Sequence, residues 1–136
     1  MVATAQMEAP QWARIVSDCN QLIHETVNPE VFFSRYDLML DTLEKLSIAE
    51  RVVDISWSPS YRLEAVRNNQ EAEISSFVER SYQQMELKAM TLKTERGKQN
   101  RKIKYYQSLI PYEKAQPYIT PMMEHDGITL SQCEIS

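Results

Sequence analysis

Apolar residues recur at steps of three and four in the first part of the chain, which is the spacing of one face of an α-helix. The stripe comprises Trp12, Ile15, Val16, Cys19, Leu22 and Ile23. It predicts a helix over residues 10–26. Asn28, Pro29 and Glu30 then supply a capping residue, a first-turn residue and an acid suited to the positive end of a helix. They predict a second helix over residues 29–50, folded back on the first through a short connection.

A third helix is predicted where Ser58 and Pro59 form another pair of capping and first-turn residues. Apolar residues continue with helical spacing as far as Leu92, so we expect this helix to cover residues 59–93. Its length would be roughly 50 Å at 1.5 Å per residue, against about 30 Å for the second helix. The longer helix should therefore overhang the shorter one and leave part of its apolar stripe to another element or another chain.

The polar stretch 93–102 contains Gly97 and predicts a break or weak hinge near residues 94–98. A continuous helix stays open as an alternative, because glycine in a helix costs only about 1 kcal/mol relative to alanine. A short fourth helix is predicted over residues 103–110. Residues 111–136 hold three prolines, one glycine and no clear periodicity, which predicts an extended, irregular tail.

These elements predict an all-α fold, an up-down helical bundle of three main helices plus a short fourth helix. The bundle domain would cover residues 10–110, between a flexible N-terminus at 1–9 and the irregular tail at 111–136. A length of 136 residues fits one domain, and the presence of only two glycines favours long helices with few connections. The chain has no run of about 18 apolar residues, no secretory signal and only two well separated cysteines. We therefore expect a cytoplasmic protein without a membrane span.

Charge is distributed unevenly along the chain, whose net charge is −4. Residues 88–104 contain seven basic residues and one acidic residue, a net charge of +6, while the remainder carries −10. One interpretation is contact with nucleic-acid phosphates or another anion, with an aromatic ring stacked on a base. The candidate residues are Lys93, Arg96, Lys98, Arg101, Lys102, Lys104 and Tyr105. We favour the alternative, a solvated basic face that pairs with acids elsewhere in an acidic chain.

The sequence predicts no catalytic, cofactor or metal site. Cys19 and His24 are five residues apart and do not share a helix face, and the remaining zinc-ligand candidates, His125 and Cys133, lie in the predicted tail. Two glycines cannot build a phosphate loop or a dinucleotide fingerprint. The motif Glu124-His125-Asp126 is expected to be an exposed polar turn, since no nucleophile accompanies it. We therefore expect a protein that is not an enzyme.

Most aromatic residues are expected to form the core. Phe32 and Phe33 are adjacent, so one narrow helical stripe cannot bury both, and Phe33 and Tyr82 become candidate interface residues. Together with the overhanging third helix, they predict a non-enzymatic protein–protein interaction or assembly module. Its partner would be another protein or a second copy in a homo-oligomer. The alternative function is a nucleic-acid-binding accessory protein that uses residues 88–104.

Two stretches of the chain carry a family resemblance. Residues 28–46 have the sequence NPEVFFSRYDLMLDTLEKL, and residues 77–100 have the sequence FVERSYQQMELKAMTLKTERGKQN. They resemble uncharacterised small helical proteins of Gram-positive bacteria, in which an NPxVFFxR-like helix start precedes a long helix that ends near LKTxxGKxN. The resemblance covers about residues 28–112 and implies no activity, cofactor or active residue. Among the matching positions, we expect Arg35 to pair with an acid on a facing helix and Thr94 to cap a helix.

Overall fold

The computed structural model describes residues 9–49 and 58–134. Within these ranges every regular element is helical, so the predicted all-α class is confirmed. The predicted flexible segment 1–9 lies outside them except for its last residue. The chain forms two compact units, of which unit 1 comprises residues up to 71 without 27–29, and unit 2 comprises residues 27–29 and 72 onward. The finer prediction of one up-down bundle of three main helices is not confirmed.

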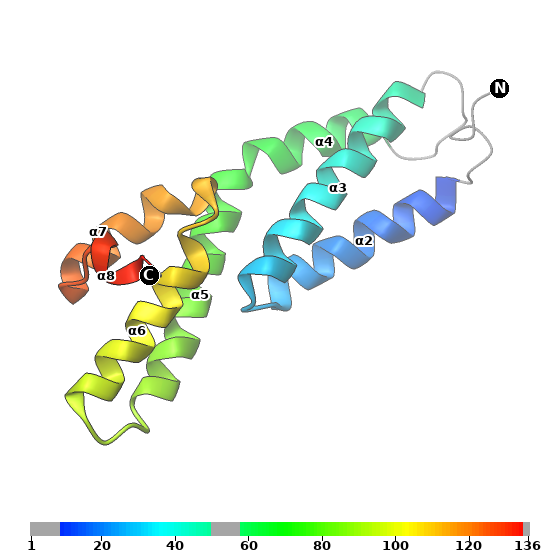
Figure 1. Cartoon of the computed structure of the whole chain (residues 1–136). Helices are drawn as coiled ribbons and strands as arrows, with labels where there is room; N and C mark the ends of the chain where they lie inside the picture. Colours follow the sequence, from blue (N-terminus) through cyan, green and yellow to red (C-terminus); the bar gives the residue numbers. More distant parts are fainter. Residues whose placement is uncertain (1–8, 50–57, 135–136) are drawn as a thin grey trace. The chain divides into compact units, whose positions relative to one another are not determined.

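Unit 1 contains the helices α2 (Ala9–Glu25), α3 (Pro29–Ala49) and α4 (Pro59–Asn68). The bounds of α2 and α3 agree with the predicted helices to within a residue or two. The chain reverses direction between α2 and α3, and α4 lies beside α3 (Figure 1). The Tyr36 hydroxyl of α3 donates a hydrogen bond to the Val66 carbonyl of α4 at 3.1 Å. The side chain of Ser58 accepts a hydrogen bond from the Tyr61 amide at 3.2 Å, which confirms the predicted cap of α4.

The core of unit 1 is almost entirely apolar. Its buried hydrophobic side chains are Val16, Cys19, Ile23, Phe32, Phe33, Tyr36, Met39, Leu43, Leu46 and Leu63. The prediction that Phe33 faces a partner is wrong, because its side chain is only 7% exposed. Its ring lies 5.0 Å from that of Phe32, nearly perpendicular to it. A central helix with neighbours on two sides buries a wide arc of its surface, and that arc takes in both adjacent phenylalanines.

The predicted third helix is interrupted and ends early. The break lies at Asn69, between α4 and the helix α5 (Gln70–Ala89), and α5 stops before the predicted end at residue 93. The Asn69 amide still donates to the Ala65 carbonyl at 3.1 Å, so the interruption is local. Asparagine is a poor helix former because its side chain competes for backbone hydrogen bonds. The pair Asn68-Asn69 therefore marks the weakest point of the predicted helix.

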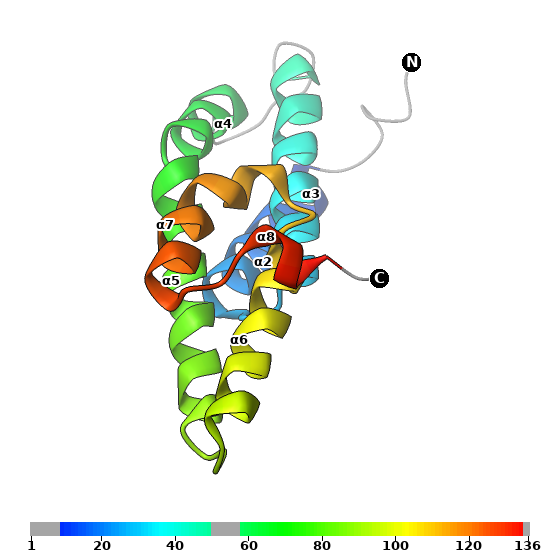
Figure 2. The ribbon, with the colours of Figure 1, turned by 60° about the vertical axis from the view of Figure 1, so that its left-hand side comes forward.

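Unit 2 is built on a helical hairpin of α5 and α6 (Glu95–Leu109), joined by residues 90–94. We call these elements the α5–α6 hairpin. They are followed by the 3-10 turn η1 (Glu113–Ala115), by α7 (Gln116–Asp126) and by α8 (Leu130–Cys133). Both α7 and α8 lie on one side of the hairpin and contact α6 (Figure 2).

The prediction of an irregular tail after residue 111 is wrong, because α7 and α8 occupy most of that segment. Pro117 lies in the first turn of α7, where its missing amide hydrogen would have no helical partner in any case. Pro121 lies inside α7, which nevertheless buries Ile119 and Met123 in unit 2. Gly127 then ends the helix in the left-handed conformation, with a φ of 66°.

The predicted break near Gly97 falls slightly earlier, at residues 90–94, and α6 begins well before the predicted start at residue 103. Thr94 caps α6 as expected, since its side chain accepts a hydrogen bond from the Gly97 amide at 2.9 Å. A β-carbon on Gly97 would lie 2.9 Å from the Thr94 Oγ1 atom. Glycine at this position therefore leaves room for the cap and does not act as a hinge.

Candidate functional site

The structure divides the basic segment between two sides of the α5–α6 hairpin. Lys98 and Lys102 line one hollow, while Lys88, Arg101 and Lys104 line another. The division follows from helix geometry, because Lys98 and Lys102 are four residues apart and share one face of α6, while Arg101 and Lys104 are three residues apart and share another. The predicted basic site is therefore two separate surfaces.

Two of the seven basic side chains pair with acids among the described residues. Lys98 Nζ lies 3.6 Å from Glu95 Oε1, and Lys102 Nζ lies 3.3 Å from Asp126 Oδ1. The basic side chains that form no ion pair with any described residue are Lys88, Lys93, Arg96, Arg101 and Lys104. Because Glu95 belongs to the basic segment itself, the expectation that the basic face pairs with acids elsewhere holds, among the described residues, for Lys102 alone.

Tyr105 is not available to stack on a base, so this part of the predicted site is wrong. Its side chain is 9% exposed, and its hydroxyl donates to the Val78 carbonyl at 2.9 Å. It also shares a hydrogen bond of 2.7 Å with the Ser81 hydroxyl. Burial raises the pKa of Tyr105 to about 12, although the hydrogen bond with Ser81 acts in the opposite direction. Tyr105 therefore fastens α6 to α5.

A polar cluster around Asp126 joins α7 to the hairpin, and the sequence interpretation missed it. The Asp126 side chain is only 4% exposed. Its Oδ2 atom accepts hydrogen bonds from the hydroxyls of Tyr106 at 2.6 Å and Tyr82 at 2.7 Å, and its Oδ1 atom accepts one from Lys102. We call these four residues the Asp126 cluster. Tyr82, a predicted interface residue, is thus partly buried and bonded within its own unit.

The ionisation of the Asp126 cluster follows from its geometry. Burial by itself would raise the pKa of the Asp126 carboxyl, but the hydrogen bonds from Tyr106, Tyr82 and Lys102 outweigh burial and lower that pKa. The pKa values of Tyr82 and Tyr106 are both raised. Burial is the largest cause, and the hydrogen bond to Asp126 is the second. At neutral pH the Asp126 carboxyl is therefore ionised and the phenols of Tyr82 and Tyr106 are neutral. These charge-assisted hydrogen bonds are stronger than neutral ones.

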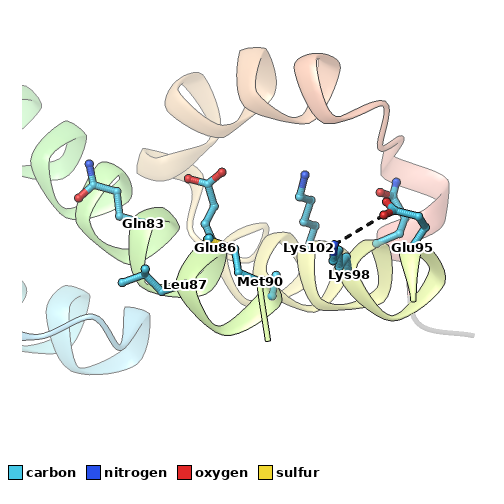
Figure 3. A pocket seen from close by; sticks show the side chains of 9 residues that line it. Gln83, Glu86, Leu87, Met90, Glu95, Lys98 and Lys102 are labelled. Carbon is cyan, nitrogen blue, oxygen red and sulfur yellow. Dashed lines mark ion pairs between the residues drawn. The ribbon is translucent and has the colours of Figure 1, made fainter. Parts of the chain in front are cut away.

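Beside this cluster, α5 and α6 enclose a groove of about 520 Å³. Its lining side chains are Gln83, Glu86, Leu87, Ala89, Met90, Glu95, Lys98, Gln99 and Lys102 (Figure 3). We call it the hairpin groove. In α6 the lining positions are spaced i, i+3, i+4 and i+7 from Glu95, and in α5 they are spaced i, i+3 and i+4 from Gln83, with Met90 directly after α5 at i+7. Such spacing defines one continuous face of each helix.

The hairpin groove has exposed apolar side chains at one wall and balanced charges around it. Leu87 is 63% exposed and Met90 is 74% exposed. Leu87 lies in the last turn of α5 and Met90 directly follows the end of α5, while Lys98 and Glu95 are paired on α6 (Figure 3). Leu87 and Met90 do not belong to the buried stripe of α5. Two large apolar residues off that stripe are the sequence signal that would have indicated the groove.

A second hollow of about 390 Å³ continues along α5 toward α7. It shares Gln83 and Glu86 with the hairpin groove and reaches Ser75 on α5 and Tyr118 on α7. The concave surface therefore follows α5 from Ser75 to Met90, a length of about 22 Å at 1.5 Å per residue.

Other candidate chemistry stays dispersed. Over residues 9–49 and 58–134, no three His, Cys, Asp or Glu side chains gather closely enough to hold a metal ion. Cys19 and Cys133 are buried free thiols, and burial raises the pKa of each. The positive charge of Arg35 acts against burial and lowers the pKa of Cys19. Contrary to expectation, Arg35 forms no ion pair with an acid among the described residues. None of the described helices is long and apolar enough to cross a membrane.

Comparison with known proteins adds no relative. No protein-family model, no curated protein and no solved structure matches this chain.

Proposed function

We propose that this chain is a non-enzymatic protein–protein interaction module that binds its partner through the hairpin groove. The observation that supports this function is the exposure of Leu87 and Met90 at the wall of a groove of about 520 Å³. Covering apolar surface contributes about 25 cal/mol per Å² to binding. Two large apolar side chains that meet at one hollow are therefore a natural anchoring point, whereas single scattered ones are ordinary surface.

This argument for an interaction function differs from the one made from the sequence, which was that the long third helix would overhang the second and leave its apolar stripe uncovered. Within unit 2, α5 buries Phe77, Val78 and Met85 against its neighbours, so this stripe is already covered. Of the exposed pair, Leu87 lies on another side of the same helix and Met90 directly follows its end. We place the module in the cytoplasm, a compartment in which two free thiols remain reduced.

A retention experiment with the full chain tests this proposal. The immobilised wild type is compared with the double variant Leu87→Ser/Met90→Ser for the proteins it retains from a lysate of the source cells. The matched control is Ile48→Ser/Tyr61→Ser in unit 1, where the side chains are 80% and 77% exposed. We expect a set of proteins that the wild type and the control retain and the groove variant loses, with all three chains equally helical by circular dichroism. Equal retention by the groove variant would overturn the proposal.

A second candidate function, nucleic-acid binding, is favoured by one specific observation. Lys88, Arg101 and Lys104 line one hollow on the hairpin and have no ion-pair partner among the described residues. Unpaired cations on one face suit contact with phosphates. The burial of Tyr105 removes the stacking ring, and the net charge of −4 opposes binding to a polyanion, so this function ranks second.

Salt dependence tests the second candidate. Fluorescence anisotropy with labelled single-stranded and duplex DNA would be measured at increasing salt, for the wild type and for Arg101→Glu/Lys104→Glu. Phosphate contact predicts affinity that falls steeply with salt and is lost in the variant. The control Arg14→Glu/Arg62→Glu reverses two exposed charges in unit 1 and should bind like the wild type. Binding that is absent, or independent of salt, would exclude this function.

A further inference from the structure

We infer that the hairpin groove takes an amphipathic α-helix of a partner protein, one whose apolar stripe is flanked by carboxylates. This inference rests on the proposed function and specifies the partner that the groove fits. It follows from the shape of the groove, from its apolar residues and from the charge around it.

The shape of the groove suits a helix. One wall is α6, which presents positions i, i+3, i+4 and i+7 from Glu95, and the other is the end of α5, which presents i, i+3 and i+4 from Gln83 and continues to Met90 at i+7. Ridges of side chains at these spacings are the surfaces into which a third helix packs. The adjoining hollow extends the surface along α5 to Ser75, and a length of about 22 Å accommodates roughly four helical turns.

The apolar residues supply anchors for such a helix. Leu87 lies in the last turn of α5 and Met90 is the first residue after that helix, and both line the groove and are largely exposed. The unbranched side chain of methionine adapts to differently shaped apolar neighbours. An incoming helix with apolar residues every three or four positions would place its stripe over this pair.

The charge selects an acidic helix. Within the groove the charges balance, because Glu86 and Glu95 face Lys98 and Lys102. The whole hairpin end, residues 86–104, carries seven basic and two acidic residues, a net charge of +5. The excess comes from side chains that have no described ion-pair partner. A helix is about 10 Å across, slightly more than the screening length of about 8 Å at physiological salt, so the cations on the far side of the hairpin act on the groove mainly at lower salt. They would speed and strengthen the approach of carboxylates.

A second copy of this chain fits the groove less well. Pairing two hairpins through the same face would bring a net charge of +5 against an equal charge, and like charges in contact oppose association. An acidic helix removes this repulsion and covers the same apolar pair. The inference therefore assigns the groove to a different chain.

Two synthetic helical peptides test the inference on the full-length protein. Both carry the same leucine stripe, which is flanked by glutamates in one peptide and by lysines in the other. Fluorescence anisotropy should show that the glutamate peptide binds the wild type and the Ile48→Ser/Tyr61→Ser control equally. Leu87→Ser/Met90→Ser should weaken its binding by about tenfold or more, given the apolar area removed. The lysine peptide should bind the wild type more weakly than the glutamate peptide does.

Other outcomes separate this inference from the proposed function. Equal or tighter binding of the lysine peptide, still dependent on Leu87 and Met90, would overturn the charge assignment while the interaction function stands. If neither peptide binds but the groove variant still loses lysate proteins, the assignment to an acidic helix is overturned and the interaction function stands.

A wild-type dimer in light scattering that Leu87→Ser/Met90→Ser abolishes would assign the groove to a second copy. Displacement of the glutamate peptide by a DNA duplex, with no effect of the groove variant, would assign the surface to phosphates. If the groove variant retains the same lysate proteins as the wild type, the proposed function itself is overturned.

Discussion

The two units each use an ion pair between separate helices, and the two pairs differ in burial. In unit 1, Arg67 Nη2 lies 2.6 Å from Glu44 Oε1, with side chains 53% and 51% exposed. In unit 2, Lys102 Nζ lies 3.3 Å from Asp126 Oδ1, with side chains 27% and 4% exposed. The longer contact serves a buried carboxylate that also accepts hydrogen bonds from two tyrosines. Removing the Asp126 carboxylate would leave the groups bonded to it without an acceptor inside the unit. In the shorter contact both side chains are half exposed, so water can replace either partner.

The largest effect should come from Asp126→Ala. It leaves the hydroxyls of Tyr82 and Tyr106 and the ammonium of Lys102 without their common acceptor, and should lower the free energy of unfolding by about 3 kcal/mol. Urea unfolding followed by circular dichroism measures the loss, and amide exchange in α7 shows whether it falls on unit 2.

Asp41→Ala is the matched control for Asp126→Ala. Asp41 pairs with Lys45 at 3.0 Å, but both side chains are more than half exposed, so its loss should cost less than about 0.5 kcal/mol. Equal effects of the two substitutions would show that burial of the carboxylate does not matter.

The next effect is a loss of stability in alkali that originates in unit 2. The pKa of Tyr105 is raised from 10.0 to about 12 in the folded chain, so above pH 10.0 the unfolded chain gives up a proton that the folded chain keeps. Stability is therefore unaffected below pH 10.0 and falls as the pH rises toward 12, by about 2 kcal/mol for this residue. Urea unfolding at increasing pH measures the slope, and Tyr105→Phe should reduce it. An unchanged slope in the variant would contradict the role of this buried phenol.

The helix caps should have smaller and similar effects in the two units. Ser58 accepts a hydrogen bond of 3.2 Å at the start of α4, and Thr94 accepts one of 2.9 Å at the start of α6. Ser58→Ala and Thr94→Ala should each cost about 1 kcal/mol, because each exposes one unpaired amide at a helix end. Amide exchange resolves the two helices, and Thr94→Ser is the conservative control that keeps the acceptor. Unchanged exchange at the start of α6 in Thr94→Ala would show that packing alone determines where α6 begins.

The smallest effect should be the coupling between Glu44 and Arg67. A double-mutant cycle with Glu44→Gln and Arg67→Gln should give about 0.5 kcal/mol, and less at high salt, because both side chains are half exposed. A coupling above about 2 kcal/mol would place this pair on a level with a buried one and would remove the contrast between the units.

The sequence alone determined where α2 and α3 begin and end, and where α4 begins. Pro29 and the pair Ser58-Pro59 mark helix starts in the structure as they do in the sequence, and Thr94 caps a helix as expected, although the start of that helix was predicted at residue 103. These signals suffice because capping joins groups within one helical turn and needs no distant partner. The hydrophobic period likewise indicated most of the core of unit 1.

Tertiary structure decided the C-terminal helices and the arrangement of the site. The local signals of residues 111–136 predicted a tail, but α7 is held by Asp126, which bonds Tyr106 at a separation of 20 residues and Tyr82 at a separation of 44. Similarly, only the packing of α5 on α6 turns Tyr105 inward and leaves Leu87 exposed. Periodicity tells which residues share a face of a helix, but which face is buried depends on contacts between segments that are distant in the sequence.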